Sequence, residues 1–358
     1  MTDRTGNGGA ASDAPLEDDE RPEGTGALGM RGIFAPVAVV VTIGLVFVAV
    51  YLAAFHAPRP HNLPLAVVGS AQATRSMQTG LNRVVPGGFK LDRVVNQRAA
   101  RDAIGYRRAY GALVAADGNL TLLYAGANGP GVASLLESVA GPTAKAAGSS
   151  LTMENILPVS TGDTRGLSIF YTAFGLVLAG FLFGTATYQV APRLELRERL
   201  LSLLVFGVAG GILITLVAKA FSAVPGSFLG LAAVITLMAV AAGGFSMSLV
   251  RVLGGPGASL AAIILLVLGN STSGGVLPRD FLPGWLHPLS EILPAGVGVR
   301  ALYGLAYFHD DGLLTAVAVL CVWSAACVMA LYLRDAFDAR NPKAPSFRTA
   351  APADSAAL

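Results

Sequence analysis

Hydrophobic residues in this chain gather in long runs, and one stretch between the first and second runs alternates short apolar and polar patterns. The first run, Ile33 to Phe55, has 23 residues and carries no charge. At 1.5 Å per helical residue it is long enough to cross a hydrocarbon core of about 30 Å. A secretory signal peptide would have a shorter apolar core behind a basic segment. The pattern therefore predicts a retained membrane helix at 33–55.

Five further apolar runs have the length of membrane-spanning helices. They are Gly166 to Tyr188, Leu200 to Phe221, Ser227 to Val250, Ala258 to Leu277 and Gly312 to Leu333. The sequence thus predicts an α-helical polytopic membrane protein with six transmembrane helices, of which the last five form a membrane domain at 167–334. Six crossings place both termini on the same side of the membrane.

Residues 56–166 have the pattern of an α/β domain inserted between helices 1 and 2. Strand and amphipathic-helix signals follow in the order β-α-β-α-β-β-α, with Asn96 as a predicted helix cap and Asp117-Gly118 as a hairpin turn. We expect a compact α/β sandwich there.

The basic residues of the short loops predict how the chain is oriented, because cytoplasmic loops carry more Lys and Arg. One side has Arg31, Arg193, Arg197, Arg199, Arg251, Arg334, Arg340 and Lys343, whereas the other has Lys219, Arg279 and Arg300. The first side is predicted to be the cytoplasm. This places both termini in the cytoplasm, 56–166 outside it, and the protein in the plasma membrane.

Composition agrees with a membrane protein. Charged residues make up 13% of the 358 residues, about half of the roughly 25% of soluble proteins, and the mean hydropathy is +0.61. The end segments 1–32, with the acidic cluster Glu17 to Glu20, and 335–358 are predicted to be disordered cytoplasmic tails. A net charge of +3 without a basic patch gives no support for nucleic-acid binding.

Motifs for catalysis are missing from the sequence. It has no phosphate-binding G-x-x-x-x-G-K-[ST], no H-E-x-x-H and no G-x-S-x-G. The histidines, His56, His61, His287 and His309, lack metal-ligand spacing. Cys321 and Cys327 are six residues apart, on different faces of one helix, which favours core packing over a disulfide. We expect no enzyme activity, cofactor or metal.

The connection at 189–201 has charges of both signs after Pro192: Arg193, Glu195, Arg197, Glu198 and Arg199. Its pattern suits a short helix at the membrane surface, with Arg197 and Arg199 available to an acidic partner. It is either a positively charged loop that sets orientation or a coupling helix that receives motion from a cytoplasmic ATPase. Lys219 is charged within a predicted span; it either reaches the headgroups or lines a transport pathway.

A proline-rich segment separates the last two apolar runs. The residues Asn270 to Gly275 end the fifth run, and 278–308 is predicted to be a re-entrant or interfacial segment on the outer side. We expect it to form an outer gate with Pro278, Pro283, Trp285, Glu291, Pro294 and Arg300.

Three motifs in this region, together with the topology, resemble a known family. They are G-N-S-T-S-G-G, L-P-x-x-F-L-P (Leu277 to Pro283) and L-P-x-G-x-G-V-R-A-L-Y (Leu293 to Tyr303). Over Ile33 to Arg334 the chain resembles the membrane subunits of ABC-2 type ATP-binding-cassette exporters, in particular the phage-infection-protein-like branch with its large extracytoplasmic domain.

This resemblance implies a permease subunit that forms a homodimer or heterodimer in membrane lipid. A separate cytoplasmic ATP-binding-cassette ATPase would hydrolyse ATP, and an amphipathic or lipid-like substrate would move outward. The alternative is a non-transporting membrane scaffold whose α/β domain binds a cell-envelope or secretion-system partner.

Overall fold

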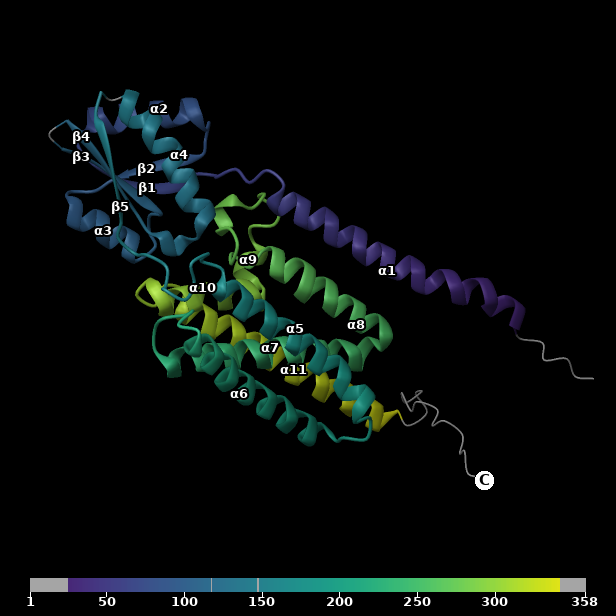
Figure 1. Ribbon diagram of the computed structural model, residues 1–358. Helices are drawn as coiled ribbons and strands as arrows, with labels where there is room; N and C mark the ends of the chain where they lie inside the picture. Colours follow the sequence, from purple (N-terminus) through teal and green to yellow (C-terminus); the bar gives the residue numbers. More distant parts are fainter. Residues whose placement is uncertain (1–24, 117, 147, 342–358) are drawn as a thin grey trace, which may run out of the picture. The chain divides into compact units, whose positions relative to one another are not determined.

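The computed structural model describes residues 25–116, 118–146 and 148–341 (Figure 1). The chain divides into two compact units, Met1–Leu45 and Val46–Leu358. Most of the two predicted disordered tails, and Asp117 of the predicted hairpin turn, lie outside the described residues.

The described parts of both predicted tails are helical. Helix α1 spans Thr25–Phe55 and helix α11 spans Leu313–Arg340, so each extends beyond its apolar run. The prediction of disorder is therefore wrong for residues 25–32 and 335–340. At the end of α11 the cause is visible, because Asp335 and Asp338 both form ion pairs with Arg251.

A five-stranded sheet forms the centre of the α/β region, which we define as residues 63–155. The strand order is β2-β1-β3-β4-β5. Strand β1 pairs in parallel with β2 and β3, β3 pairs antiparallel with β4, and β4 pairs in parallel with β5. The strands are β1 (Leu63–Val68), β2 (Phe89–Arg93), β3 (Gly111–Ala116), β4 (Asn119–Tyr124) and β5 (Ser150–Asn155).

Helices cover both faces of this sheet (Figure 1). Helices α2 (Ala71–Val84) and α4 (Pro130–Ala146) cover one face of the sheet. Their apolar side chains form a buried cluster with Leu65 of β1 and Leu113 of β3. Helix α3 (Gln97–Gly105) packs on the other face. Its predicted cap is confirmed, since the Asn96 side chain accepts a hydrogen bond of 2.9 Å from the backbone N–H of Ala99.

Strand β5 is an element that the sequence pattern does not predict. Its side chains are mostly exposed, and it lacks the apolar alternation that identifies a half-buried strand. Pairing with β4 along Asn119 to Tyr124 defines it, aided by the hydrogen bond from Asn119 to Thr152. Edge pairing of this kind is a tertiary contact and leaves no local signature.

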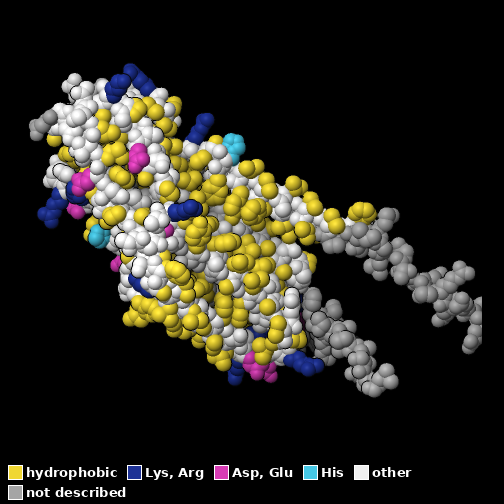
Figure 2. Space-filling view, viewed as in Figure 1, with side chains coloured by type: hydrophobic (Ala, Val, Ile, Leu, Met, Phe, Trp, Pro, Cys, Tyr) yellow, Lys and Arg dark blue, Asp and Glu magenta, His cyan; other side chains and the backbone are white. Residues whose placement is uncertain are grey.

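Within the described residues, five helices are long and apolar enough to cross a membrane, which agrees with five of the six predicted segments and with a polytopic membrane protein. Figure 2 shows apolar side chains over much of the visible face of the helical part of the chain. The five candidate spans are Val37–Phe55 within α1, α5 (Ser168–Val190), α6 (Leu196–Ala220), α7 (Phe228–Leu253) and α11.

Helix α7 is the centre of the bundle and packs against α5, α6 and α11 (Figure 1). Small residues permit these close contacts. A side chain built on Gly184 of α5 would lie 2.5 Å from Ser246 Cβ of α7, and one built on Gly180 would lie 3.0 Å from Ala242 Cβ.

The predicted span at 258–277 is shorter than expected. Helix α8 (Gly255–Ala261) continues into the π-helical segment η2 (Ala262–Gly269). Together they extend about 20 Å, less than the roughly 30 Å of a hydrocarbon core. The polar residues after it are buried, and Asn270 Nδ2 donates a 2.8 Å hydrogen bond to the hydroxyl of Tyr51.

Short helices connect this segment to α11. They are η3 (Arg279–Phe281), α9 (Leu289–Ile292) and α10 (Pro294–Tyr307). Ten of the 14 residues of α10 are buried, and at about 21 Å the helix is too short to cross a membrane unaided.

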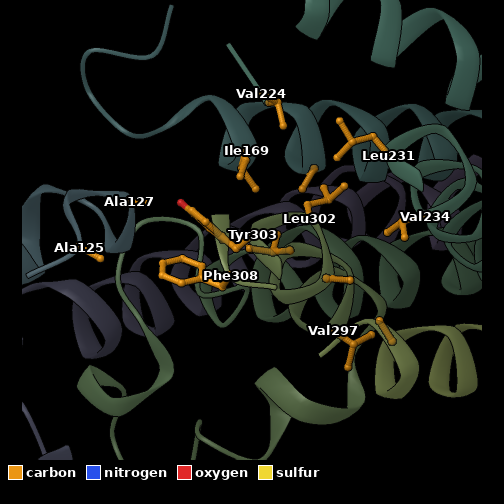
Figure 3. Close-up of a cluster of buried hydrophobic side chains, with 14 of the residues drawn as sticks. Ala125, Ala127, Ile169, Val224, Leu231, Val234, Val297, Leu302, Tyr303 and Phe308 are labelled. Carbon is orange, nitrogen blue, oxygen red and sulfur yellow. The ribbon is translucent and has the colours of Figure 1, made fainter. Parts of the chain in front are cut away.

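The α/β region and the bundle share one hydrophobic core. Ile104 and Ala125 of the α/β region belong to the same buried cluster as Tyr303 and Phe308. Figure 3 shows Tyr303 and Phe308 next to each other, with Ala125 and Ala127 on one side and helix residues such as Leu302 on the other. A short 3-10 turn, η1 (Gly126–Asn128), carries Ala127.

Candidate functional site

Two cavities with charged walls lie near opposite ends of helix α11. The first, of about 380 Å³, includes Thr315 in its wall, and we call it the Arg300 cavity. The second, of about 550 Å³, includes Asp335 and Asp338, and we call it the Arg251 cavity. Thr315 and Asp338 are 23 residues apart on one helix, or about 34 Å along its axis.

Four parts of the chain form the Arg300 cavity. Arg107 and Tyr110 come from the connection between α3 and β3. The turn at 273–279, helices α9 and α10, and the start of α11 form the other walls. The cavity is therefore assembled from segments about 200 positions apart in the sequence.

Two ion pairs stand in the wall of the Arg300 cavity. Arg300 binds Asp311 through Nε and Nη2, each at 3.0 Å from a carboxylate oxygen. Arg279 pairs with Glu291. A bidentate pair fixes the plane of the guanidinium, so Arg300 is held in one orientation.

Gly312 makes room for the Arg300 side chain. It begins α11 with a left-handed backbone, φ 75°, and a side chain there would lie 2.7 Å from Arg300 Cγ. Only glycine satisfies both requirements without strain.

Arg107 also faces this cavity, yet it has no acidic partner among the described residues. Its guanidinium carbon lies 5.2 Å from the centre of the Tyr303 ring and 5.0 Å from that of Phe308. Its Nε is buried without a hydrogen-bond partner in the described part of the chain. No sequence motif singles out Arg107, which lies near the end of the helix predicted to start after Asn96, like any surface arginine.

Tyr110 joins the α/β region to η3. Its hydroxyl donates a 2.6 Å hydrogen bond to Asp280 Oδ2, and the backbone N–H of His61 donates to the carbonyl of Asp280 at 2.9 Å. Burial raises the pKa of Tyr110 far above its usual range; nearby Arg107 opposes this rise and Asp280 adds to it. The phenol therefore stays protonated and serves as a donor.

The structure brings together half of the predicted gate residues. Pro278, Glu291 and Arg300 line the Arg300 cavity, whereas Pro283, Trp285 and Pro294 do not. Trp285 is 60% exposed, as expected for an interfacial tryptophan, and Pro294 is buried at the first turn of α10. Glu291 and Arg300 pair with other residues and not with each other.

At the other end of α11, the predicted coupling loop forms part of the Arg251 cavity through Glu195 and Arg199. The surface helix predicted at 189–201 is absent: α5 ends at Val190, a turn follows, and α6 begins at Leu196. Residues 196–201 are instead the first turns of a spanning helix, since Glu198 caps it by accepting a 2.9 Å hydrogen bond from the N–H of Glu195.

Arg199 points inward and is only 6% exposed. Its guanidinium donates to the carbonyls of Leu194, Pro192 and Ala191 at 3.0, 3.0 and 3.2 Å. It also lies 4.1 Å from the centre of the Tyr188 ring. Arg199 is thus a structural clamp on the turn, and its predicted availability to an acidic partner is wrong. Arg193 and Arg197 are exposed.

Arg251, at the end of α7, also lines this cavity. Its Nη2 lies 2.7 Å from both Asp335 Oδ1 and Asp338 Oδ2 on α11. These ion pairs tie the ends of α7 and α11 together beside the α5–α6 turn.

Lys219 lines neither cavity. Its Nζ donates a hydrogen bond to the carbonyl of Gly226, in the connection between α6 and α7. This contact lies at the end of α6 and fits an ammonium directed away from the middle of the span. It agrees with the interpretation that Lys219 reaches the headgroups.

No cluster of three His, Cys, Asp or Glu side chains suited to a metal ion occurs within the described ranges 25–116, 118–146 and 148–341. His309 instead packs against Tyr106, with ring centres 4.9 Å apart and ring planes tilted by 33°. Cys327 is buried and Cys321 exposed, both as free thiols.

Comparison with known proteins gives no match to this chain among protein-family models, curated proteins or solved structures. The arguments on function therefore rest on the two cavities and their residues.

Proposed function

We propose that this chain is the membrane permease subunit of an ATP-binding-cassette exporter, which moves an amphipathic or lipid-like substrate outward while a separate cytoplasmic subunit hydrolyses ATP. In this proposal the helical segment 255–269 is the sixth crossing, which the sequence predicts at 258–277. Both termini are cytoplasmic, and residues 56–166 are extracytoplasmic. The Arg300 cavity then opens on the outer side and the Arg251 cavity on the cytoplasmic side.

The presence of a charged cavity at each end of one helical bundle is the observation that carries this proposal. Alternating access requires a polar opening toward each side of the membrane and a packed region between them. Helices α5 and α7 supply that region, because Gly180 and Gly184 bring their backbones into direct contact. A protein that only anchors an ectodomain has no need for either opening.

A short sixth crossing is compatible with the bilayer. A hydrophobic stretch of about 20 Å is accommodated by local thinning, and the buried polar residues after Gly269 form hydrogen bonds within the protein. The end of this crossing thus lies against protein and not against lipid.

The ATPase is proposed to dock on the exposed part of the α5–α6 turn, at Arg193 and Arg197. The turn forms part of the Arg251 cavity, and the Arg199 clamp makes it rigid. A displacement of this turn would therefore move α5, α6 and the ends of α7 and α11 together. A second permease subunit, identical or homologous, would complete the transporter.

The test measures ATPase activity that co-purifies with the affinity-tagged full chain from its own cell membranes. We expect ATP hydrolysis with the wild-type chain and loss of most of it in the double variant Arg193→Glu with Arg197→Glu. Arg340→Glu is the matched control, because Arg340 is also exposed and is predicted to lie on the same side.

Equal ATPase recovery with the double variant and the control would refute docking at this turn. If no ATPase accompanies the wild-type chain, the scaffold function takes the place of the exporter. Cross-linking on the cell surface should then capture an envelope or secretion-system partner through the α/β region.

A further inference from the structure

The charges that line the Arg300 cavity do not balance. Three arginines, Arg107, Arg279 and Arg300, face two carboxylates, Glu291 and Asp311. Both carboxylates are engaged in ion pairs with Arg279 and Arg300. The nearby Asp280 is engaged by the Tyr110 hydroxyl. One positive charge, that of Arg107, remains without a partner among the described residues.

The backbone and the neighbouring rings orient Arg107. Its φ of 54° is in the left-handed region, which costs a residue other than glycine about 1–2 kcal/mol and is common at functional sites. Tyr303 and Phe308 lie near its guanidinium carbon, and both rings are buried. The side chain is thus held in place by protein contacts that do not neutralise it.

Arg107 lines the cavity, and its terminal nitrogens have no hydrogen-bond partner among the described residues. Its Nε is buried, and the two rings pack against the guanidinium. Terminal guanidinium N–H groups form a planar fork that matches two oxygens of one anion. The free donor set therefore fits a carboxylate or a phosphate group.

Part of the cavity wall is apolar. Ile292, which is exposed, and Val297 and Val299 of α10 contribute to it. A volume of about 380 Å³ is at the lower end of the range for small-molecule sites. It is sufficient for a charged head group and the first carbons of a chain that leaves the cavity over Ile292.

We propose that the Arg300 cavity binds the singly charged anionic head group of an amphiphile, a carboxylate or a phosphodiester, with Arg107 as the principal donor. The ligand lies between the α/β region and α10, because Arg107 belongs to the first and Arg300 to the second. Binding neutralises the unpaired charge of the wall. The inference concerns binding alone and holds with or without an ATPase partner.

The test is equilibrium binding to the purified full chain in maltoside micelles, with empty micelles as the blank. The probes are radiolabelled dodecanoate, dodecanoyl lysophosphatidylglycerol, acetate and dodecyltrimethylammonium. We expect saturable binding of one or both anionic amphiphiles. Acetate, which lacks the chain, and the cationic amphiphile should bind at least about tenfold more weakly.

Arg107→Gln should raise the Kd of the anionic amphiphile about tenfold or more, because a charge-assisted hydrogen bond is lost. Arg108→Gln is the matched control and should change the Kd less than about twofold. Arg108 is the next residue, is exposed, and does not line the cavity. Equal Kd values for the wild-type and Arg107→Gln proteins, or equal losses in the two variants, would overturn the proposal.

A second variant guards against misfolding at the left-handed position of Arg107. Thr315 is exposed in the first turn of α11, where a carboxylate is favoured by the helix dipole. Thr315→Glu adds a negative charge to the wall and should weaken binding about fivefold or more without loss of folded protein. Unchanged binding in this variant would contradict an anion site. Acetate binding as tight as that of dodecanoate would contradict the amphiphile.

Discussion

The hydroxyl of Tyr110 donates a 2.6 Å hydrogen bond to the carboxylate of Asp280, a residue 170 positions later in the chain. Tyr110 directly precedes β3 of the α/β region, and Asp280 lies in η3, before α9 and α10. Phe281, the next residue, is buried in the core of the α/β region. The predicted gate segment is therefore fastened to the α/β region, so movement of one is transmitted to the other.

Replacing Tyr110 with phenylalanine tests this link. Tyr110→Phe removes the donor and leaves the Asp280 carboxylate without that partner, which we expect to lower the free energy of unfolding by about 1–3 kcal/mol. Unfolding of the detergent-solubilised chain, followed by circular dichroism against temperature and denaturant, measures the change. Tyr106→Phe serves as control, because Tyr106 is 52% exposed, and should shift stability by no more than about 0.5 kcal/mol.

The same pair of proteins gives a prediction for alkaline pH. The folded pKa of Tyr110 is raised, so its contribution to stability is complete below the unfolded pKa of about 10 and is lost as pH rises through the folded pKa. Above pH 10 the wild-type chain should lose up to about 1.4 kcal/mol per pH unit relative to Tyr110→Phe. Unfolding curves between pH 8 and 11 test this, and a stability difference that does not change with pH would contradict it.

Close packing of α5 against α7 makes Gly184 sensitive to substitution. In Gly184→Ala the new methyl group would lie 2.5 Å from Ser246 Cβ and 2.6 Å from the Met247 nitrogen. We expect destabilisation by about 1–3 kcal/mol or more, because the helices must separate. Gly175→Ala on the same helix meets nothing within 4 Å and should be neutral or slightly stabilising. Thermal unfolding monitored by light scattering and fluorescence compares them.

The two arginines of the α5–α6 turn should behave differently. Arg199→Gln leaves the carbonyls of Ala191, Pro192 and Leu194 without their shared donor, which should lower stability by about 1–3 kcal/mol. Arg197→Gln, at an exposed position, should stay within about 0.5 kcal/mol of the wild type. Chemical unfolding of both variants measures this difference, and equal stabilities would show that the clamp contributes nothing.

Periodicity and run length were sufficient to predict local elements of this protein such as the long apolar helices, a helix cap and a hairpin. Uncharged runs predict spanning helices, because length and hydropathy are properties of the segment itself, and five of the six runs are long apolar helices. The cap at Asn96 and the hairpin strands on either side of residues 117–118 follow from short-range backbone chemistry in the same way. Three of the predicted gate residues, Pro278, Glu291 and Arg300, also line a cavity.

Contacts between distant segments determined the features that the sequence pattern does not predict. Strand β5 exists because β4 offers it an edge, and the end of α11 is helical where Arg251 of another helix binds it. Arg199 turns inward because three carbonyls of the preceding turn converge on it. Arg107 becomes a candidate ligand-binding residue only when Tyr303 and Phe308, about 200 positions away, pack against it. A sequence pattern records the solvent preference of each segment, whereas the partners of a charge are fixed only when the segments pack together.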